Sequence, residues 1–230
     1  SGPLNPFKII SSLNKHNGNS LSADASVYLI LINHLYKRTL KISDQLRWCK
    51  IASQPLNVDQ KEAVLKLFPN ANIIYNYGLT EAMRCCLLSL NQERDKIASA
   101  GKPAEGVKIK IMIDEREAEP EERGKVYTKG DNLCVGYFGK PQLWMSKLVG
   151  DWYDTGDIGY KDADGYVFIL GRGDDAFNIG GRTISPYEVE TIISSYFVPE
   201  EYLVSSLESP LTSEELVLVL ERVPKDFDWV

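Results

Sequence analysis

The chain of 230 residues is long enough for one large domain, or for one domain together with a small second one. Its composition, 43% hydrophobic and 25% charged, is ordinary for a globular protein, and its net charge of −6 argues against nucleic acid as a partner. The longest apolar run, residues 27–32, is too short to span a membrane. The four cysteines match no zinc spacing, so we expect reduced, mostly buried thiols of a cytoplasmic protein.

Residues 1–100 alternate strand and helix patterns. The predicted elements are a buried strand running into a helix over residues 24–40, a strand over 46–52, a helix from Pro55 to about Pro69, and a strand over 73–75. The second helix should turn inward an apolar face made of Val58, Ala63, Val64 and Leu67. This alternation predicts an α/β fold in which the first part of the chain is part of a doubly wound sheet.

The pattern changes after residue 100. Short alternating runs predict strands over residues 107–113, 125–128, 133–137 and 165–170. The acidic run over residues 114–122 is typical of a solvated hairpin loop and only rarely of a metal site. Residues 101–171 therefore predict a small antiparallel β sheet or barrel.

A third segment begins at residue 172. Residues 186–196 predict a helix with Val189, Ile192 and Ile193 facing inward, and residues 215–223 predict a strand. No further element follows in the printed sequence, so we expect the last unit to be truncated.

Residues 76–81, Asn-Tyr-Gly-Leu-Thr-Glu, directly follow a predicted strand, where ligands bind in open α/β sheets. Tyr77 offers a flat face to a base, and Gly78 lets a ligand approach the backbone closely. Thr80 offers a hydroxyl to a phosphate oxygen, and Glu81 offers a hard oxygen ligand to Mg²⁺. The alternative is a turn in which Thr80 caps a helix.

Three later segments have the same polar, glycine-rich character. Asp157, beside a glycine in a predicted tight turn, can accept both hydroxyls of a ribose, and the alternative is a plain turn aspartate. Arg172 can reach ribose or phosphate oxygens and Asp174 can be a hinge, and the alternative is a solvated charged turn. The pair Gly180-Gly181 permits close backbone approach, ahead of a helix that starts at Ser185-Pro186; the alternative is a loop and cap.

The order and spacing of these segments resemble the adenylate-forming superfamily, which includes acyl- and aryl-CoA synthetases, peptide-synthetase adenylation domains and firefly luciferase. The segment NYGLTE is similar to the family motif Tyr-Gly-x-Thr-Glu, and WYDTGDIGY is similar to Tyr-x-Thr-Gly-Asp. The segment GKVYTKGDNLCVGYFGKP resembles the family's Gly-Glu-Leu…Gly…Gly-Tyr motif. GRGDDAFNIGGRTISPYEVE resembles Gly-Arg-x-Asp-Asp…Gly…Ile-x-Pro-x-Glu-Val-Glu.

The resemblance implies a role for each matching residue. Adenine would stack on Tyr77, within a nucleotide segment that also contains Asn76 and Gly78. Thr80 would hold phosphate and Glu81 would hold Mg²⁺. Asp157 would bind the ribose hydroxyls, helped by Arg172. Asp174 would be the hinge of a C-terminal lid, and Gly181 would line the pantetheine tunnel.

The implied activity is that of an AMP-forming acyl- or aryl-CoA (or acyl-carrier) ligase. Its ligands would be ATP or AMP, Mg²⁺, a carboxylic acid, and coenzyme A or phosphopantetheine as thiol acceptor, with an acyl carrier protein as a further candidate partner. Residues 1–100 would be a partial α/β subdomain of the large N-terminal domain, 101–171 a β subdomain, and 172–230 a truncated C-terminal α+β lid.

This sequence also departs from the family. The glycine-rich phosphate loop and the catalytic lysine of the lid have no counterpart in the 230 residues. Asn178 stands where many members have lysine, and Arg182 directly follows Gly181 instead of lying two residues on. We therefore expect the chain alone to be inactive, and a non-catalytic nucleotide-binding or interaction protein of the same family remains the alternative. No G-x-G-x-x-G follows an early strand, which argues against a dinucleotide-dependent oxidoreductase.

Overall fold

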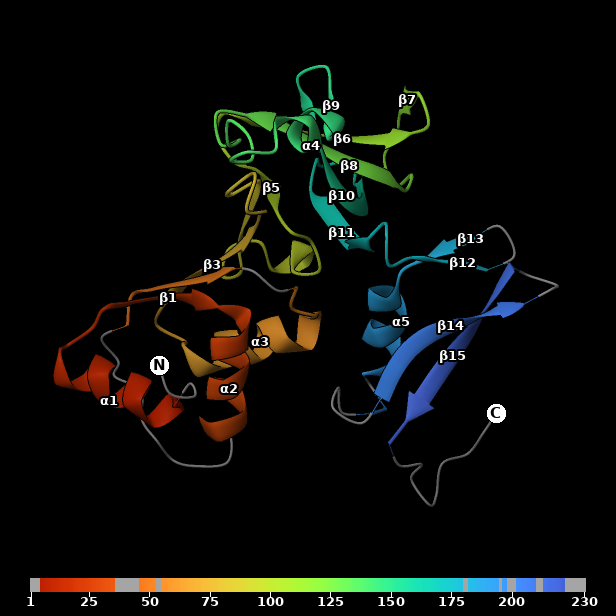
Figure 1. Ribbon diagram of the computed structural model, residues 1–230. Coiled ribbons are helices and arrows are strands. Elements are labelled where there is room, and N and C mark those ends of the chain that lie inside the picture. Colours follow the sequence, from red (N-terminus) through yellow and green to blue (C-terminus); the bar gives the residue numbers. More distant parts are fainter. Residues whose placement is uncertain are drawn as a thin grey trace.

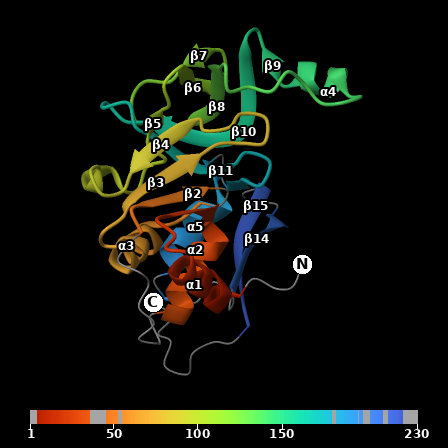
Figure 2. The ribbon, with the colours of Figure 1, turned by 90° about the vertical axis from the view of Figure 1, so that its left-hand side faces the viewer.

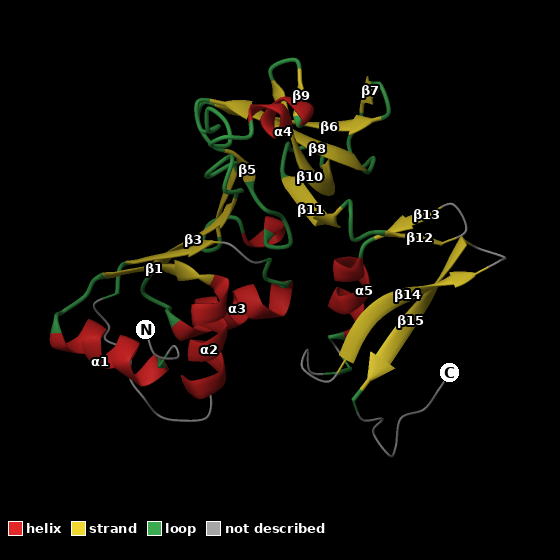
Figure 3. Cartoon of the chain, in the orientation of Figure 1, coloured by secondary structure: helices red, strands yellow, loops and turns green. Residues whose placement is uncertain are grey.

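The computed structural model describes residues 5–35, 46–52, 55–179, 182–194, 196–197, 202–209 and 213–221. In this part of the chain, three β-sheets follow one another in sequence order (Figure 1). Helices gather beneath the first sheet, the second region consists of strands and loops with one short helix, and the third combines a sheet with one helix (Figure 3). No helix among these residues is long and apolar enough to cross a membrane.

The first sheet has the strand order β1-β2-β3-β4-β5, with β1 to β3 parallel and the last two strands antiparallel. Its strands are β1 (Ser20–Asp24), β2 (Trp48–Ala52), β3 (Asn72–Tyr77), β4 (Cys86–Ser89) and β5 (Lys102–Pro103), and its helices are α1 (Pro6–Lys15), α2 (Ala25–Leu35) and α3 (Val58–Leu67). All three helices lie on one side of the sheet in Figure 1. A short 3₁₀ helix, η1 (Arg94–Lys96), precedes β5.

Helix α3 begins at Val58, three residues later than predicted, because Asn57 is its N-cap and forms a reciprocal capping box with Gln60. Its inner face differs from the prediction. Val58 is 39% exposed, whereas Lys61 and Val64, three residues apart, are the buried positions. The predicted face was therefore wrong at Val58, and a lysine lies on the inner face.

The buried strand predicted at the start of residues 24–40 was also wrong. The strand β1 ends at Asp24, and residues 27–32 belong to helix α2. Tyr28 and Leu31 are fully buried against the sheet. A helix that is apolar around most of its circumference has no helical period to detect, which is why its pattern resembled a buried strand.

The second sheet has the order β11-β10-β8-β6-β7, with β9 paired to β10. Its elements are β6 (Val107–Ile113), β7 (Arg116–Glu117), β8 (Gly124–Gly130), α4 (Pro141–Ser146), β9 (Leu148–Val149), β10 (Trp152–Lys161) and β11 (Val167–Arg172). Three predicted strands are confirmed as β6, β8 and β11. In Figure 2 the first sheet rises from β2 through β3 and β4 to β5, which lies next to the second sheet.

Two predictions in this region were wrong. Residues 133–137 form a loop with only a single bridge, from Leu133 to Ala82, because Gly136 has φ of 141°, outside the range of a regular strand. The predicted turn at Asp157 is instead the middle of the long strand β10. The pairing register of β10 with β8 shifts between Asp154 and Ile158, where Gly156 has φ of 75°.

The third sheet has the order β13-β12-β15-β14, made of β12 (Phe177–Ile179), β13 (Arg182–Ile184), β14 (Tyr202–Ser209) and β15 (Ser213–Leu220). Helix α5 (Pro186–Ile193) starts as predicted, with Ser185 as N-cap and Glu188 closing a capping box. Ile192 is 68% exposed, so its predicted inward orientation was wrong.

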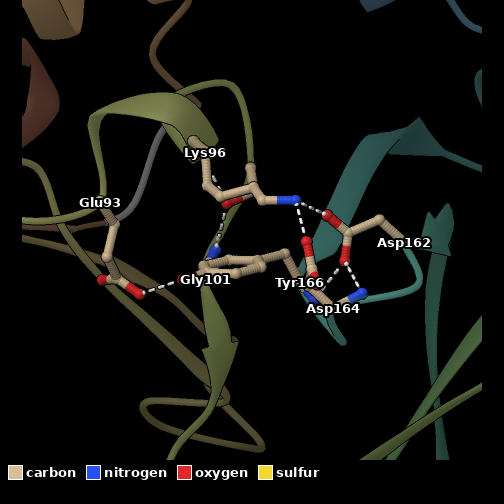
Figure 4. Close-up of polar contacts among 7 residues, drawn as sticks. Glu93, Lys96, Gly101, Asp162, Asp164 and Tyr166 are labelled. Carbon is tan, nitrogen blue, oxygen red and sulfur yellow. Dashed lines mark hydrogen bonds and ion pairs between the residues drawn. The ribbon is translucent and has the colours of Figure 1, made fainter.

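A polar cluster joins the first two sheets (Figure 4). Lys96, at the end of η1, forms ion pairs of 2.8 Å with Asp162 and 2.5 Å with Asp164, both in the turn after β10. The Tyr166 hydroxyl donates to Glu93 over 2.7 Å. Since each contact links the first sheet's η1 region to the second sheet's β10–β11 turn, the cluster fixes one sheet against the other.

Backbone contacts continue the same joint. Ala100 N donates to Val167 O over 2.7 Å, and Val167 N donates to Gly101 O over 2.9 Å. Gly101 has φ of 98°, and a Cβ there would lie 2.0 Å from Leu87 O, so the position requires glycine.

Candidate functional site

A cavity of about 300 Å³ opens between the first two sheets and helix α5. Its walls are the end of β3, residues 98–100, the middle of β10, the end of β11, and the start of α5. Asn76, Tyr77, Gly78, Asp157 and Arg172 all line it. Five of the residues singled out from the sequence, distributed over nearly 100 positions, therefore share one cavity.

Asp157 is the centre of the polar contacts in this cavity. Tyr77 Oη donates to Asp157 Oδ2 over 2.5 Å, and Arg172 Nη1 donates to Asp157 Oδ1 over 3.2 Å. Asp157 is 5% exposed, while the Arg172 side chain is 48% exposed. The three residues come from β3, β10 and β11, so the arrangement depends on the joint between the first two sheets.

Electrostatics follow from this burial. Burial raises the pKa of Asp157 above its ordinary value, against the opposing effects of the Tyr77 hydroxyl and Arg172. Burial, and then the neighbouring Asp157 carboxylate, raises the pKa of Tyr77 well above its ordinary value. Tyr77 is consequently a neutral donor, and each Asp157 oxygen keeps a lone pair for a further donor.

The irregularity in β10 orients Asp157. Thr155 Oγ1 donates to Val126 O over 2.8 Å and accepts from Asp157 N over 3.1 Å. Gly156 has φ of 75°, which favours glycine, and a Cβ there would lie 2.9 Å from Arg172 Nη2, so a larger residue would displace the guanidinium. Arg172 Nη1 also donates to Thr155 O over 2.9 Å.

Asn76 and Gly78 shape the β3 end of the cavity. Asn76 Oδ1 is buried and has no hydrogen-bond partner among the described residues. A buried acceptor without a partner is unfavourable, so the position suits a ligand that brings a donor. A Cβ on Gly78 would lie 2.7 Å from Arg84 N, because the following loop folds back onto it.

Thr80 and Glu81 lie in that loop, outside the cavity lining. The helix-cap alternative for Thr80 was wrong, since residues 78–85 form turns and no helix follows. Thr80 is exposed. The Glu81 carboxylate accepts one hydrogen bond, from the Tyr137 hydroxyl over 2.5 Å, and Tyr137 Oη is 3.0 Å from Tyr153 Oη.

Asp174, which the resemblance assigns to the hinge of the lid, does not line the cavity. Asp174 is exposed in the turn that connects β11 to β12, which is the covalent link from the second sheet to the third. Gly181 lies outside the described residues.

Three residues at the cavity or beside Glu81 were not predicted from the sequence. Tyr187, on α5, lines the cavity, and Lys61, on α3, lines it from the first region. Tyr137 holds Glu81. The sequence offered one signal for Lys61: it lies three residues before the apolar Val64, and residues at this spacing share a face of a helix. Tyr187 could not be found because its place depends on how the third region packs on the first.

The fold and the cavity define a class: an α/β protein with a polar ligand pocket at the carboxyl end of the parallel strand β3, where a second sheet adds an acidic group. Residues 4–138 match the family of AMP-binding enzymes, and the chain belongs to this family.

Known proteins agree with the assignment. The chain is 30% identical over 202 residues to the 2-succinylbenzoate–CoA ligase of Bacillus subtilis (strain 168), covering 87% of this chain and 40% of that protein. It resembles the structure of O-succinylbenzoate coenzyme A synthetase from B. subtilis in complex with AMP, with a TM-score of 0.83 and 27% identity, over 97% of this chain and 45% of that one. The structure of that synthetase with ATP and magnesium ion matches with a TM-score of 0.80 and 26% identity, over 96% and 45%.

These matches confirm the predicted fold class. The chain spans less than half the length of the proteins it matches.

Proposed function

We propose that the cavity binds the adenosine part of ATP or AMP, and that the chain is part of an AMP-forming ligase that joins a carboxylic acid to a thiol. The observation that carries the proposal is the buried Asp157 carboxylate, presented by Tyr77 and Arg172 at the wall of a cavity of about 300 Å³. A carboxylate with free lone pairs in such a place is suited to the paired hydroxyls of a ribose.

The β3 end of the cavity fits adenine. Asn76 Oδ1 is an acceptor in need of a donor, and the exocyclic amino group of adenine is one. Tyr77 and Gly78 follow it in the cavity wall, where an aromatic face and a close backbone approach suit a planar base.

Thr80 and Glu81 would serve the phosphate groups. Among the described residues no group of three or more metal-ligating side chains occurs. In the loop after β3, Glu81 would offer its carboxylate to Mg²⁺. That fits Mg²⁺, which is commonly held by one or two carboxylates together with phosphate oxygens and water. The ion would neutralise phosphate charge, while the Tyr137 hydroxyl orients Glu81 and the Thr80 hydroxyl donates to a phosphate oxygen.

The proposed reaction has two steps. The substrate carboxylate attacks the α-phosphorus of ATP and pyrophosphate leaves; a thiol, of coenzyme A or phosphopantetheine, then displaces AMP from the mixed anhydride. The relatives are named for 2-succinylbenzoate, so an acid carrying an aryl group is the corresponding substrate class for this chain. Residues 1–100, 101–171 and 172–230 would be the two parts of the body and the lid, with Asp174 at the hinge and Gly181 beside the thiol.

A second candidate is a nucleotide-binding protein of this family without catalysis. It is favoured by the contrast between the buried Asp157 and the exposed Thr80. Calorimetric titration of the chain with AMP tests the binding proposal that both candidates share. ATP–pyrophosphate exchange with arylalkanoic acids, in a full-length relative whose corresponding segment is replaced by this sequence, distinguishes between them.

A further inference from the structure

Lys61 is a buried cation in the wall of the cavity. It lies on α3, is 2% exposed, and lines the cavity. Its Nζ donates to Ile97 O over 2.8 Å and to Ser99 O over 2.9 Å, and lies 4.1 Å from the centre of the Tyr75 ring. One ammonium group therefore binds both a loop and a strand that border the cavity.

Among the described residues, no carboxylate forms an ion pair with Lys61. The adjacent acidic residue on the helix, Glu62, pairs with Arg94 instead. Burial lowers the pKa of Lys61 to about 7. A buried amine without a counter-ion is unfavourable, and its hydrogen bonds to two carbonyls only partly offset this. A methionine would fill a similar space without the free-energy cost of burying an amine. Packing alone therefore does not explain why a lysine occupies this position.

The groups held by Lys61 are those that shape the proposed base site. Residues 98–100 line the cavity, and the two carbonyls bound by Nζ lie within or next to this segment. Tyr75 is the strand residue directly before Asn76 and Tyr77. Lys96, directly before residues 97–100, forms the ion pair with Asp162 that is drawn in Figure 4. Ser99 Oγ donates to Lys96 O over 2.8 Å.

We infer that Lys61 is a positioning residue for the nucleobase: it holds residues 97–100 at the distance from β3 that admits adenine. The inference rests on the proposed function. It predicts that the removal of the two N–H donors widens the site, which weakens AMP binding and also reduces the preference for AMP over the larger GMP.

The test is Lys61→Met, with Lys66→Met as the matched control, because Lys66 is an exposed lysine on the same helix. We expect the dissociation constant for AMP to rise about 10-fold in Lys61→Met, the loss of about one net hydrogen bond, and to be unchanged in Lys66→Met. The ratio of the GMP to the AMP dissociation constant should fall at least threefold. Amide hydrogen exchange of residues 97–101 should accelerate, while that of β10 should not.

Lys61→Arg keeps a cation with several donors and should recover part of the AMP affinity and the base preference; if it does not, the carbonyl contacts are not what matters and the inference is wrong. Equal losses for AMP and GMP, or unchanged exchange at residues 97–101, would likewise overturn it. If wild-type protein binds AMP and Lys61→Met binds it equally well, only the inference fails. If the wild-type chain does not bind AMP, the proposed function fails and the inference with it.

Discussion

The two ends of the proposed nucleotide site are built very differently. On the nucleoside side, Asp157 is buried, and donors from two other strands fix its carboxylate. On the phosphate side, Thr80 is exposed and Glu81 has one hydroxyl partner, Tyr137. We therefore expect the nucleoside side to determine the affinity for the nucleotide and the phosphate side to determine the rate of the reaction. Contacts to adenosine are similar in ground and transition states and contribute binding, whereas charge stabilisation at the phosphates contributes rate.

The largest expected effect concerns catalysis by the 230-residue chain itself. The resemblance implies that a glycine-rich loop and a lid lysine neutralise the triphosphate, and the 230 residues contain no counterpart of either. If each is worth ~3 kcal/mol in the transition state, ATP–pyrophosphate exchange should be at least about 10⁴-fold slower than in a full-length relative. Radiolabelled pyrophosphate exchange measures this. Robust exchange that is abolished by Glu81→Ala would show that the phosphate side is complete.

Asp157→Ala should have the next largest effect. Hydrogen bonds to a charged group contribute about 1.5–3 kcal/mol, so the dissociation constant for AMP should rise roughly 10- to 100-fold. Asp151→Ala is the control, because Asp151 is an exposed aspartate before the same strand. Calorimetric titration with AMP measures both. Equal effects of the two substitutions would mean that Asp157 does not contact the ligand.

The pH dependence of AMP binding should sharpen the same contrast. Burial raises the pKa of Asp157, so the carboxylate is protonated at a higher pH than an ordinary aspartate and then loses acceptor capacity. AMP affinity should therefore fall on acidification, with a midpoint above 3.8. For unfolding the sign is opposite: the folded state retains this proton longer, so the contribution of Asp157 to stability decreases as pH rises through that window.

The control for the pH profile is Asp157→Asn, which reports the titration of the ligand and of the other groups. Subtracting its profile should isolate the Asp157 step. An identical profile in the two proteins would contradict the assignment.

The smallest expected effect is that of Glu81→Gln on AMP binding without Mg²⁺. The substitution keeps the size of the side chain and an acceptor for Tyr137, so we expect less than a twofold change. With ATP and Mg²⁺ present, the variant should lose whatever affinity the ion adds to the wild type. A large loss of AMP affinity in the absence of Mg²⁺ would mean that Glu81 contributes to the nucleoside side. The contrast between the nucleoside and phosphate sides would then not hold.

What the sequence predicted depended on local signals. The helix cap at Ser185 and the alternating strand β6 were predictable because each is determined within a few residues. Asp157 was identified through its motif, but its place in a strand was missed, because a glycine with positive φ beside it resembles a turn. Lys61 was hidden because burial of a lysine is decided by the packing of a distant loop.

The central claim is that Asp157 binds the ribose hydroxyls, and the most direct measurement compares AMP with 2′,3′-dideoxy-AMP in two proteins. In the wild type, the dideoxy ligand should bind roughly 10- to 100-fold more weakly, because the two hydroxyl donors are lost. In Asp157→Ala, the two ligands should bind equally. If Asp157→Ala still discriminates between them as strongly as the wild type does, the hydroxyls are bound elsewhere and the account of the site is wrong.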